Sequence, residues 1–491
     1  STAARQMLKR LQSHCPISAL ILAFASMHRA GGHVDSGQAD VRVRIYVLAV
    51  FSCVALTQCL NWFTFSSVDA RKFEEYYKPG ALPAEASKED VDFQIRLMLN
   101  WGPIFGVLMF PVQGWLLTRP HGLQQTLRLS LTLVMFGAAL RALPSLCAPG
   151  GSTKAAAVLG SPQLSLTLLH LGQILNASAG PFVMGCASRL SVIWFPESQR
   201  TTATAIGSTA NGAGVTVGFL LGPWLVPGGK DFSNLILSEM VWALIPWLCG
   251  IFFLPPAPSE PPSAAAAAVA AGTASTLTFG EGLQLALTNK SYGMLILGAG
   301  ILLGAGSAWQ AVLHDMLRPA GYSDLFIGYL GFANSLATNV GAVISGRLAD
   351  SRAFRGRFKA VLTIGLSAML VAGALWAFSC TSKGASGVLV CLISAIGLGN
   401  GMADPVYYEL GAELTYPAPE GTSAGILVCV WNLTSLVMIF LPCRMGLAVN
   451  WVYNALILVS LLLVLSVRER HHRPLDAVAP TLPDPKRPQA Q

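Results

Sequence analysis

Long uninterrupted runs of apolar residues recur along the whole chain, and they constrain its fold more than any other feature. Each run is about 20 residues long, which is enough for a helix to cross the hydrocarbon core of a bilayer. In lipid, only α-helices and closed β-barrels satisfy their own backbone hydrogen bonds, and these runs are continuous rather than alternating. Because 53% of residues are hydrophobic and only 11% are charged, the sequence predicts an all-α membrane protein.

Twelve expected spans fall into two groups of six. They cover residues 44–68, 92–117, 122–145, 162–193, 201–226, 232–254, 291–317, 323–348, 358–379, 385–412, 420–442 and 449–467. Between the sixth and seventh spans lies "PPAPSEPPSAAAAAVAAGTAST", residues 255–276, whose Pro, Ala and Ser content is typical of a linker. The sequence thus predicts twelve transmembrane helices in two six-helix halves.

The expected organisation follows from these spans and from the distribution of charge. It comprises an N-terminal arm (1–41), a first half (42–254), a linker (255–290), a second half (291–467) and a basic tail (468–491). The arm, the tail and the segments from even to odd spans hold most of the 32 Lys and Arg residues. The positive-inside rule therefore predicts that both termini are cytosolic. This topology accounts for the net charge of +8 without a nucleic-acid partner.

A shorter apolar run, "ISALILAFASM" at residues 17–27, precedes the first span. It is too short to cross a bilayer as a helix and could also be the core of a signal peptide. We expect an interfacial or targeting segment, because cleavage after it would leave the mature N-terminus outside the cell.

Carboxylates are concentrated in "GNGMADPVYYELGAELTYPAPEG", residues 399–421, although charged groups are costly within a membrane. Asp404 is expected near the bilayer centre, where it would bind a cationic substrate or carry a proton. For Glu409 two roles are equally expected, a gate ion pair and a proton-sensitive role. Glu413 and Glu420 lie toward the cytosolic end, where gate ion pairs are the expected role.

Basic partners for those carboxylates occur near the same end of the bundle. Arg189 lies at the end of the fourth span, and "GRLADSRAFRGRFK" (346–359) joins the eighth and ninth spans. Gly346 lets helices approach closely, and Asp350 can cap the next segment or pair with Arg352. The equivalent segment of the first half, "GWLLTRPHGLQQ" (114–125), keeps the Gly and a basic residue but not the Asp.

The first helix of each half carries a tryptophan beside an amide. These pairs are Asn61–Trp62 and Trp309–Gln310, and each lies at a similar depth in its span. Tryptophan alone is typical of an anchor at the membrane surface, whereas Asn and Gln are costly against lipid and favour a bundle interior or a wet cavity. The pairs are therefore candidate substrate contacts, with outer-leaflet anchors as the alternative. His314 and Asp315, close to Gln310, are expected to be solvated rim residues or a pH-sensing outer gate.

Two blocks carry a family resemblance. "SAGPFVMGCASRLSVIWFPESQRTTATAIGSTANGAGVTVGFLLGPWLVP" (178–227) and "DPVYYELGAELTYPAPEGTSAG" (404–425) resemble the feline leukaemia virus subgroup C receptor-related carriers. This family is a branch of the major facilitator superfamily, whose signature loop resembles residues 346–359. The resemblance covers most of residues 42–467 and is greatest to the branch that contains the disrupted-in-renal-carcinoma member.

The resemblance implies a secondary carrier that moves a small organic solute by alternating access. Family members carry choline, ethanolamine, haem or vitamin B6 compounds, so the expected substrate is pyridoxine-like or choline/ethanolamine-like, with proton coupling and a lysosomal, endosomal or plasma-membrane location. A haem or porphyrin exporter and a non-transporting receptor or sensor remain alternatives. We expect a monomer in the lipid bilayer without cofactor or enzymatic activity, since neither a GxxxxGK[ST] loop nor a metal-ligand motif occurs in the sequence.

The resemblance also suggests which residues contact the substrate. Trp62 and Trp309 lie at the positions of an aromatic cage, and Asn432 lies where the choline carriers have a substrate-facing Gln. A cation over a Trp ring gains ~2 kcal/mol when desolvated, whereas a pyridine ring would stack between the same rings. Asn211, Tyr407 and Tyr408 complete the candidate substrate-binding set.

Overall fold

The fold is known from a computed structural model, in which every regular element described is helical. The structure describes residues 36–67, 88–117, 119, 121–146, 162–226, 232–263, 266–267, 279–350, 357–381, 385–416, 418, 420–441 and 445–468. The apolar run at 17–27, Arg352 and the basic tail beyond residue 468 lie outside these ranges, so the predictions made for them stay predictions.

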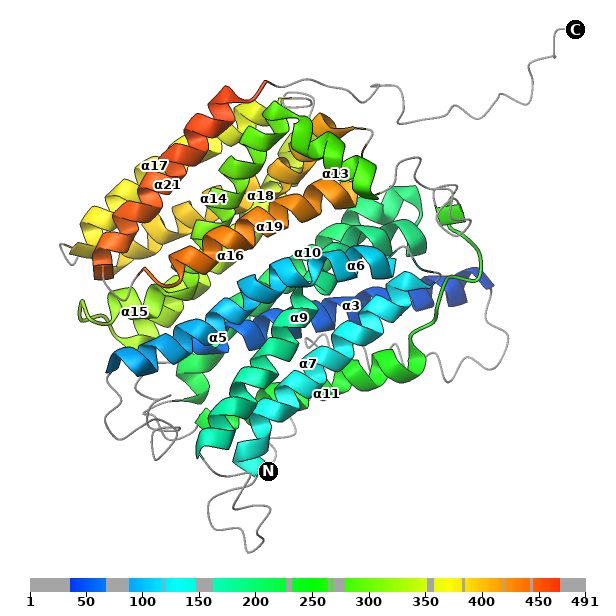
Figure 1. Cartoon of the computed structure of the whole chain (residues 1–491), viewed down its shortest axis with the longest axis horizontal. Coiled ribbons are helices and arrows are strands. Elements are labelled where there is room, and N and C mark those ends of the chain that lie inside the picture. The colour runs from blue at the N-terminus through cyan, green and yellow to red at the C-terminus, as the bar shows by residue number, and fades with distance from the viewer. Residues whose placement is uncertain are drawn as a thin grey trace, which may run out of the picture.

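Helices form two groups along the chain. Those of the first half are α3 (Ser36–Ser67), α5 (Lys88–Leu108), α6 (Phe110–Leu117), α7 (Gly122–Leu146), α9 (Pro162–Trp194), α10 (Glu197–Leu225) and α11 (Phe232–Phe253). Those of the second half are α13 (Phe279–Thr288), α14 (Lys290–Ala311), α15 (Leu313–Leu317), α16 (Asp324–Asp350), α17 (Phe358–Thr381), α18 (Ser386–Thr415), α19 (Glu420–Met438), the 3₁₀ turn η2 (Gly446–Ala448) and α21 (Val449–Ser466). Figure 1 shows the two groups as adjacent bundles, with blue-to-green helices below and green-to-red helices above.

Each of the twelve expected spans coincides with one helix or with a broken pair of helices. Within the described residues, eight helices are long and apolar enough to cross a membrane on their own, or nine when a bent pair is counted as one span. The end of the predicted linker also folds, because α13 occupies residues 279–288.

The second span is broken where α5 gives way to α6 at a bend of 47°. Pro111 lies in the first turn of α6 and has no backbone N–H to donate to the preceding turn, so it weakens the helix at this point. Helical hydrogen bonding continues across the bend, because the Met109 N–H donates to the Phe105 carbonyl and the Gln113 N–H donates to the Met109 carbonyl, each at 2.9 Å. A Pro-induced bend therefore divides this span.

The halves meet chiefly along two helix pairs, α5 with α19 and α10 with α16. The second contact is partly polar: the hydroxyl oxygens of Thr216 and Ser335 are 2.7 Å apart, and Asn339 Nδ2 donates to Thr216 Oγ1 at 3.2 Å. Such short polar side chains hydrogen-bond between helices within a membrane and let the backbones approach.

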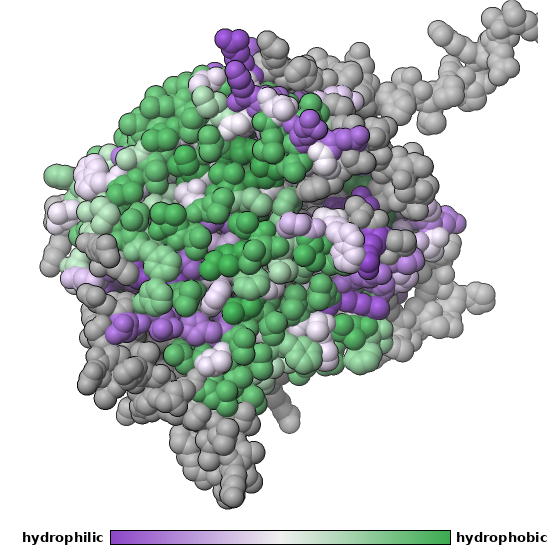
Figure 2. All heavy atoms as spheres, viewed as in Figure 1, coloured by the Kyte–Doolittle hydropathy of each residue, from purple (hydrophilic) through white to green (hydrophobic). Residues whose placement is uncertain are grey.

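Apolar side chains cover most of the visible surface across both halves, and hydrophilic residues gather toward its ends (Figure 2). Large side chains such as Trp224, Phe252 and Phe378 are exposed over 75%, 66% and 68% of their surfaces. Exposed apolar area on this scale requires an apolar solvent. The surface is therefore that of a helical bundle embedded in lipid.

Glycines bring α16 and α18 together. A methyl group at Gly401 would lie 1.8 Å from the Thr338 carbonyl oxygen, and one at Gly341 would lie 2.4 Å from the Leu398 carbonyl oxygen. Small residues at such crossings allow van der Waals contact between backbones, which stabilises helices in lipid.

We predict that Gly401→Ala destabilises the folded protein, because the added methyl group must push α16 away from α18. Overpacking of this kind costs about 1–3 kcal/mol. The thermal midpoint of purified protein in detergent measures the effect. Gly365→Ala on α17 is the control, since a methyl group there meets nothing within 4 Å. Equal midpoints for the two variants would contradict the close α16–α18 packing.

Candidate functional site

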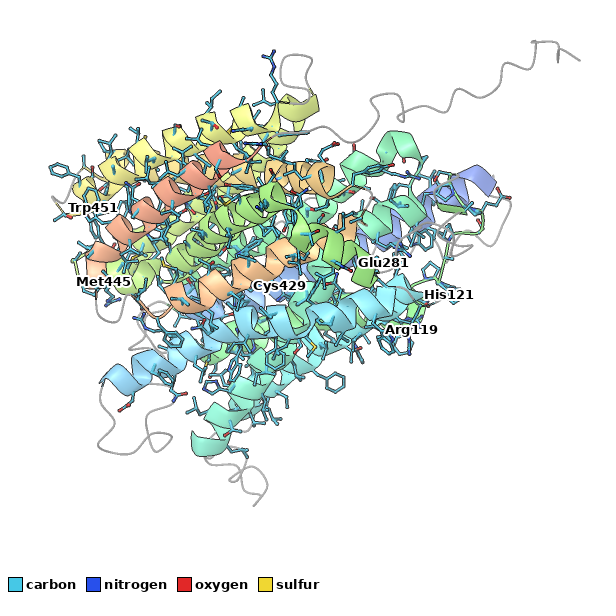
Figure 3. All side chains as sticks on the ribbon, turned by 45° about the horizontal axis from the view of Figure 1, so that its top comes forward. Arg119, His121, Glu281, Cys429, Met445 and Trp451 are labelled. Carbon is cyan, nitrogen blue, oxygen red and sulfur yellow. The ribbon has the colours of Figure 1, made fainter. Side chains whose placement is uncertain are left out.

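The bundle has two distinct ends. At the proximal end α3 begins and α21 stops, and at the distal end α3 and α14 stop and α5 begins. Figure 3 places Arg119 and His121 at one end of the molecule and Met445 and Trp451 at the other. His121 has a positive φ of 55°, which turns the chain sharply between α6 and α7.

At the distal end, contacts between the halves form a closed cluster, here called the distal gate: Ser66, Arg96, Ala311, Asp315 and Ile439. Arg96 Nη2 pairs with Asp315 Oδ2 at 3.2 Å, and Arg96 Nη1 donates to the Ile439 carbonyl at 3.0 Å. Ser66 Oγ donates to the Ala311 carbonyl at 2.5 Å. The gate thus ties α3 and α5 of one half to α14, α15 and the end of the α19 segment in the other.

The neighbouring residues His314 and Asp315 have different partners. Asp315 belongs to the distal gate, whereas His314 is buried and its Nε2 lies 3.1 Å from Asp324 Oδ1, which Arg318 also contacts. The prediction of a solvated rim is therefore wrong for His314.

Trp62 and Asn432 come from opposite halves and pack against successive turns of α5. A methyl group at Gly102 would lie 2.4 Å from Trp62 Nε1, and one at Gly106 would lie 2.6 Å from Asn432 Nδ2. Residues four apart on a helix are ~5–6 Å apart on one face. The structure therefore brings these two predicted substrate residues close together.

Hydrogen bonds fix the orientation of the Trp62 ring. Its indole N–H donates to the Leu99 carbonyl at 2.9 Å, so the ring face is the part left to contact a ligand. Asn61 and Asn100 flank this bond in sequence, both are fully buried, and neither side-chain amide has a hydrogen-bond partner among the protein atoms described. Buried amides without protein partners are usually bonded to water or ligand.

Trp309 lies elsewhere, inside the second half. Its ring stacks on Tyr453 at 5.0 Å between centroids and meets Trp376 edge-on at 5.9 Å. Its indole N–H donates to Asn450 Oδ1 at 2.8 Å, and the Trp376 N–H donates to the same oxygen at 3.1 Å. In this conformation the structure does not bring Trp309 together with Trp62. The neighbouring Gln310 has a buried Nε2 atom without a hydrogen-bond partner in the described part of the chain.

Asp404 lies on α18 with a buried Oδ1 atom that accepts no hydrogen bond from the described residues. Asn400, one turn earlier, likewise has an unpartnered Oδ1. The Asn400 amide faces Gly306 of α14. A methyl group added at Gly306 would lie 3.3–3.4 Å from the two amide atoms of Asn400 and 2.9 Å from Tyr453 Oη. These groups form a polar region between α14, α18 and α21.

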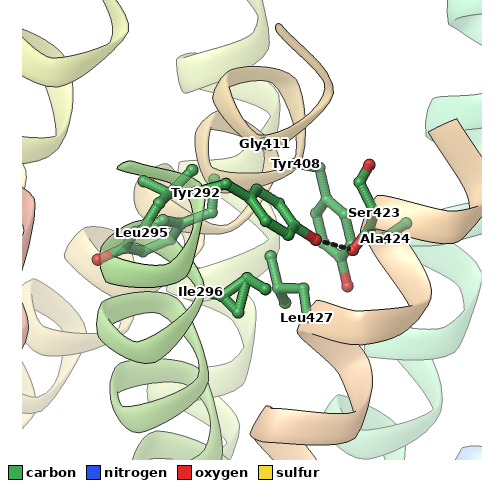
Figure 4. Close-up of a pocket in the computed structure, with 9 residues that line it drawn as sticks. Tyr292, Leu295, Ile296, Tyr408, Gly411, Ser423, Ala424 and Leu427 are labelled. Atoms are coloured by element: carbon green, nitrogen blue, oxygen red, sulfur yellow. Dashed lines mark hydrogen bonds between the residues drawn. The ribbon is translucent and has the colours of Figure 1, made fainter. Parts of the chain in front are cut away.

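In this structure the remaining candidate substrate residues lie at contacts between helices. The Tyr407 hydroxyl lies 2.9 Å from Ser460 Oγ on α21. Asn211 Nδ2 donates to the Ala55 carbonyl at 3.2 Å, which ties α10 to α3. Tyr408 lines a narrow crevice between α14, α18 and α19, in which the Tyr292 hydroxyl donates to the Ser423 carbonyl at 2.7 Å (Figure 4). This crevice is too narrow for a water molecule, so it is no substrate site in this conformation.

Among the predicted gate residues, Arg189 on α9 is half-buried and donates to the Leu117 carbonyl at 3.5 Å. Glu409 is exposed and Glu413 is half-buried on α18. Gly346 and Asp350 lie in the last turns of α16, and Glu420 begins α19. Ion pairing at the proximal end stays a prediction.

Sequence reasoning missed a buried charge pair in the first half. Arg141 Nη2 lies 2.8 Å from Glu239 Oε2, and both side chains are almost fully buried. The available signal was a charged residue within each of two apolar runs, 122–145 and 232–254, the same signal that drew attention to Asp404.

These features define a membrane transporter: two six-helix halves, polar groups inside each half, and a gate that closes one end. The chain belongs to the Major Facilitator Superfamily, whose family model matches residues 80–439. The predicted fold class is thereby confirmed, as is the prediction that the protein is not an enzyme.

Individual relatives agree with this family. A solute carrier family 49 member 4 homolog of Xenopus laevis is 29% identical and the match covers 88% of this chain and 92% of the relative. The choline/ethanolamine transporters FLVCR1 of Felis catus and flvcr2a of Danio rerio are 27% and 28% identical, over 78% and 79% of this chain and 64% and 77% of their own. The predicted membership of the feline leukaemia virus subgroup C receptor-related family is therefore confirmed.

Solved structures show the same fold. A D-xylose-proton symporter has a TM-score of 0.63 at 14% identity, with 86% of this chain and 98% of that chain covered. At this identity the likeness concerns the fold alone.

We predict that Asp315→Asn opens the distal gate more often, because the variant loses the charge that holds Arg96. Loss of a charged hydrogen bond costs about 1.5–3 kcal/mol, which raises the open fraction roughly tenfold or more. Labelling of Ala311→Cys by an impermeant maleimide added at the distal side measures opening, because Ala311 is buried. Arg96→Asp combined with Asp315→Arg should restore slow labelling. Unchanged labelling of Asp315→Asn would show that the pair does not hold the gate.

Proposed function

We propose that this transporter moves a small organic amine by alternating access, with choline or ethanolamine as the first candidate. The observation that carries the proposal is the approach of Trp62 and Asn432, one from each half, on successive turns of α5. Two relatives, both named choline/ethanolamine transporters, support the same substrate class.

The chemistry at Trp62 suits such a cargo. Because the indole N–H is bonded to Leu99, the ring offers its face, and a desolvated ammonium over that face gains ~2 kcal/mol. The amide of Asn432 can accept a hydrogen bond from a hydroxyl or ammonium group of the same molecule. The unpartnered amides of Asn61 and Asn100 add polar groups beside the ring.

A vitamin B6-type solute such as pyridoxine is the second candidate, and Asp404 is the observation that favours it. Its buried, unpartnered Oδ1 can bind a protonated pyridine nitrogen or a proton in transit. Intramembrane carboxylates of this kind commonly serve proton relays. We therefore assign proton coupling to Asp404, with Glu409 as the alternative carrier.

Alternating access follows from the distal gate. With the Arg96–Asp315 pair made, the distal end is shut, and exchange at that end requires the pair to break while the halves rock about α5–α19 and α10–α16. Trp62 moves with one half and Asn432 with the other, so the contacts of a bound amine would differ between the two states. This is how differential contacts couple binding to a conformational change.

The proposed setting is a lysosomal, endosomal or plasma membrane with both termini in the cytosol, and the proposed acting unit is a monomer. The distribution of basic residues supports this orientation. Haem or porphyrin export and ligand sensing without transport are the competing functions. Purified protein in liposomes separates them: accumulation of labelled choline or pyridoxine supports the carrier of amines, whereas binding without accumulation supports the sensor.

We predict that Trp62→Ala lowers kcat/KM for choline uptake into liposomes by roughly 30-fold, the equivalent of the ~2 kcal/mol of a desolvated cation–π contact. Trp224→Ala is the matched control, because that side chain is 75% exposed on the outer surface and should not affect uptake. Trp309→Ala should chiefly lower thermal stability, since its ring is packed among Trp376, Tyr453 and Asn450. Normal uptake by Trp62→Ala would place the cargo elsewhere.

We predict that Asp404→Asn removes the pH dependence of transport. A carboxylate that must gain a proton before the carrier turns makes uptake faster as pH falls on the loading side, and an amide cannot change its charge. Initial rates of pyridoxine and choline uptake between pH 5 and 8 test this. A variant with the same pH profile as the parent protein would assign coupling to another group.

A further inference from the structure

The buried charge pair of the first half joins four helices. Arg141 on α7 pairs with Glu239 on α11, and Thr64 on α3 donates a short hydrogen bond to the other oxygen of Glu239. Arg141 Nη1 also donates to Gln173 Oε1 on α9 at 3.2 Å. Arg141 is 0% exposed and Glu239 2%, so both charges are satisfied by protein groups rather than by water.

Two bonds from this cluster reach the main chain of α3 beside Trp62. Arg141 Nη1 donates to the Asn61 carbonyl at 2.8 Å, and Gln173 Nε2 donates to the Trp62 carbonyl at 3.4 Å. Both acceptors are backbone oxygens, so the bonds constrain where the helix lies and not merely one rotamer. The cluster thus holds the segment of α3 from which the Trp62 ring projects.

Glycines make room for this arrangement. A methyl group at Gly172 would lie 2.5 Å from the Gly137 carbonyl and 2.6 Å from Arg141 Cγ. The absence of side chains lets α7 and α9 touch and lets the Arg141 side chain lie directly against the α9 backbone.

The second half fixes its first helix with neutral groups. There Trp376 on α17, at a depth similar to that of Arg141 on α7, and Asn450 at the start of α21 enclose the Trp309 side chain. The charged cluster in the first half holds the backbone of α3, and the Trp62 side chain bonds instead to the Leu99 carbonyl of α5. The two halves therefore hold equivalent tryptophans in different ways.

We propose that Arg141, Glu239 and Gln173 form a positioning device that fixes the α3 backbone at Asn61 and Trp62 and thereby sets the affinity for substrate. None of the three needs to contact the cargo. A buried ion pair is seldom a better source of stability than apolar packing of equal volume, which is consistent with a role in specifying geometry. The last step, from Trp62 to affinity, rests on the proposed function.

The test uses Gln173→Met, which keeps side-chain length but removes the donor to Trp62 and the acceptor for Arg141. Protein labelled with 5-fluorotryptophan reports each ring by ¹⁹F NMR, and the Trp62 resonance is assigned by its loss in Trp62→Phe. We expect Gln173→Met to shift or broaden the Trp62 resonance while that of Trp309 stays in place. For choline uptake, KM should rise at least threefold and the maximal rate should change less than twofold.

Gln124→Met is the matched control. Gln124 lies on α7, the helix of Arg141, and its Nε2 donates to the Leu254 carbonyl at 2.7 Å rather than to α3. It should leave both the Trp62 resonance and KM unchanged. Glu239→Gln is the second variant, since it keeps the shape of the side chain and removes the charge that orients Arg141; the same changes are expected.

The outcomes separate the two proposals. An unchanged Trp62 resonance in folded Gln173→Met overturns the positioning device. Failure of both Gln173→Met and Glu239→Gln to fold also overturns it, because the cluster would then be a structural requirement only. A shifted resonance with unchanged KM keeps the device and overturns the assignment of Trp62 to the substrate site.

Discussion

The interior of a bilayer has no water, and this constraint governs the whole structure. Each buried polar group must find its partner within the protein, which is why short side chains such as Thr126 and Ser130 donate to the carbonyl one turn earlier. The same constraint explains the Arg141–Glu239 pair, whose charges are satisfied by each other and by three further polar groups. Asn61, Asn100 and Asp404 carry buried polar atoms without such a partner among the described residues, and for this reason the proposed cargo and proton sites include them.

The helices themselves were predictable because length and hydropathy are local properties. All twelve expected spans coincide with a helix or a broken pair, and the proline that bends the second span is visible at position 111. The site was only partly predictable. Trp62 and Asn432 are distant in sequence, and their approach depends on two glycines of a third helix that no pattern linked to either residue.

Trp309 shows why the rest of the site escaped prediction. Its depth and its amide neighbour match those of Trp62, yet its ring is enclosed by residues of α17 and α21. The direction in which a side chain points around a helix depends on neighbours from other helices, and periodicity is weak evidence for it when a helix is apolar on all sides. Arg141 and Glu239 were visible as charges in apolar runs, but their pairing required the packing of α7 against α11.

Gly102 and Gly106 give α5 a bare surface where the two halves share it. Trp62 and Asn432 both lie against that surface, so the spacing between these two side chains depends on the path of the α5 backbone. Adding a single methyl group to α5 would displace an aromatic ring on one side or an amide on the other. At the proposed amine site, selectivity can therefore change through two glycines that have no side chain of their own, while Trp62 and Asn432 stay the same.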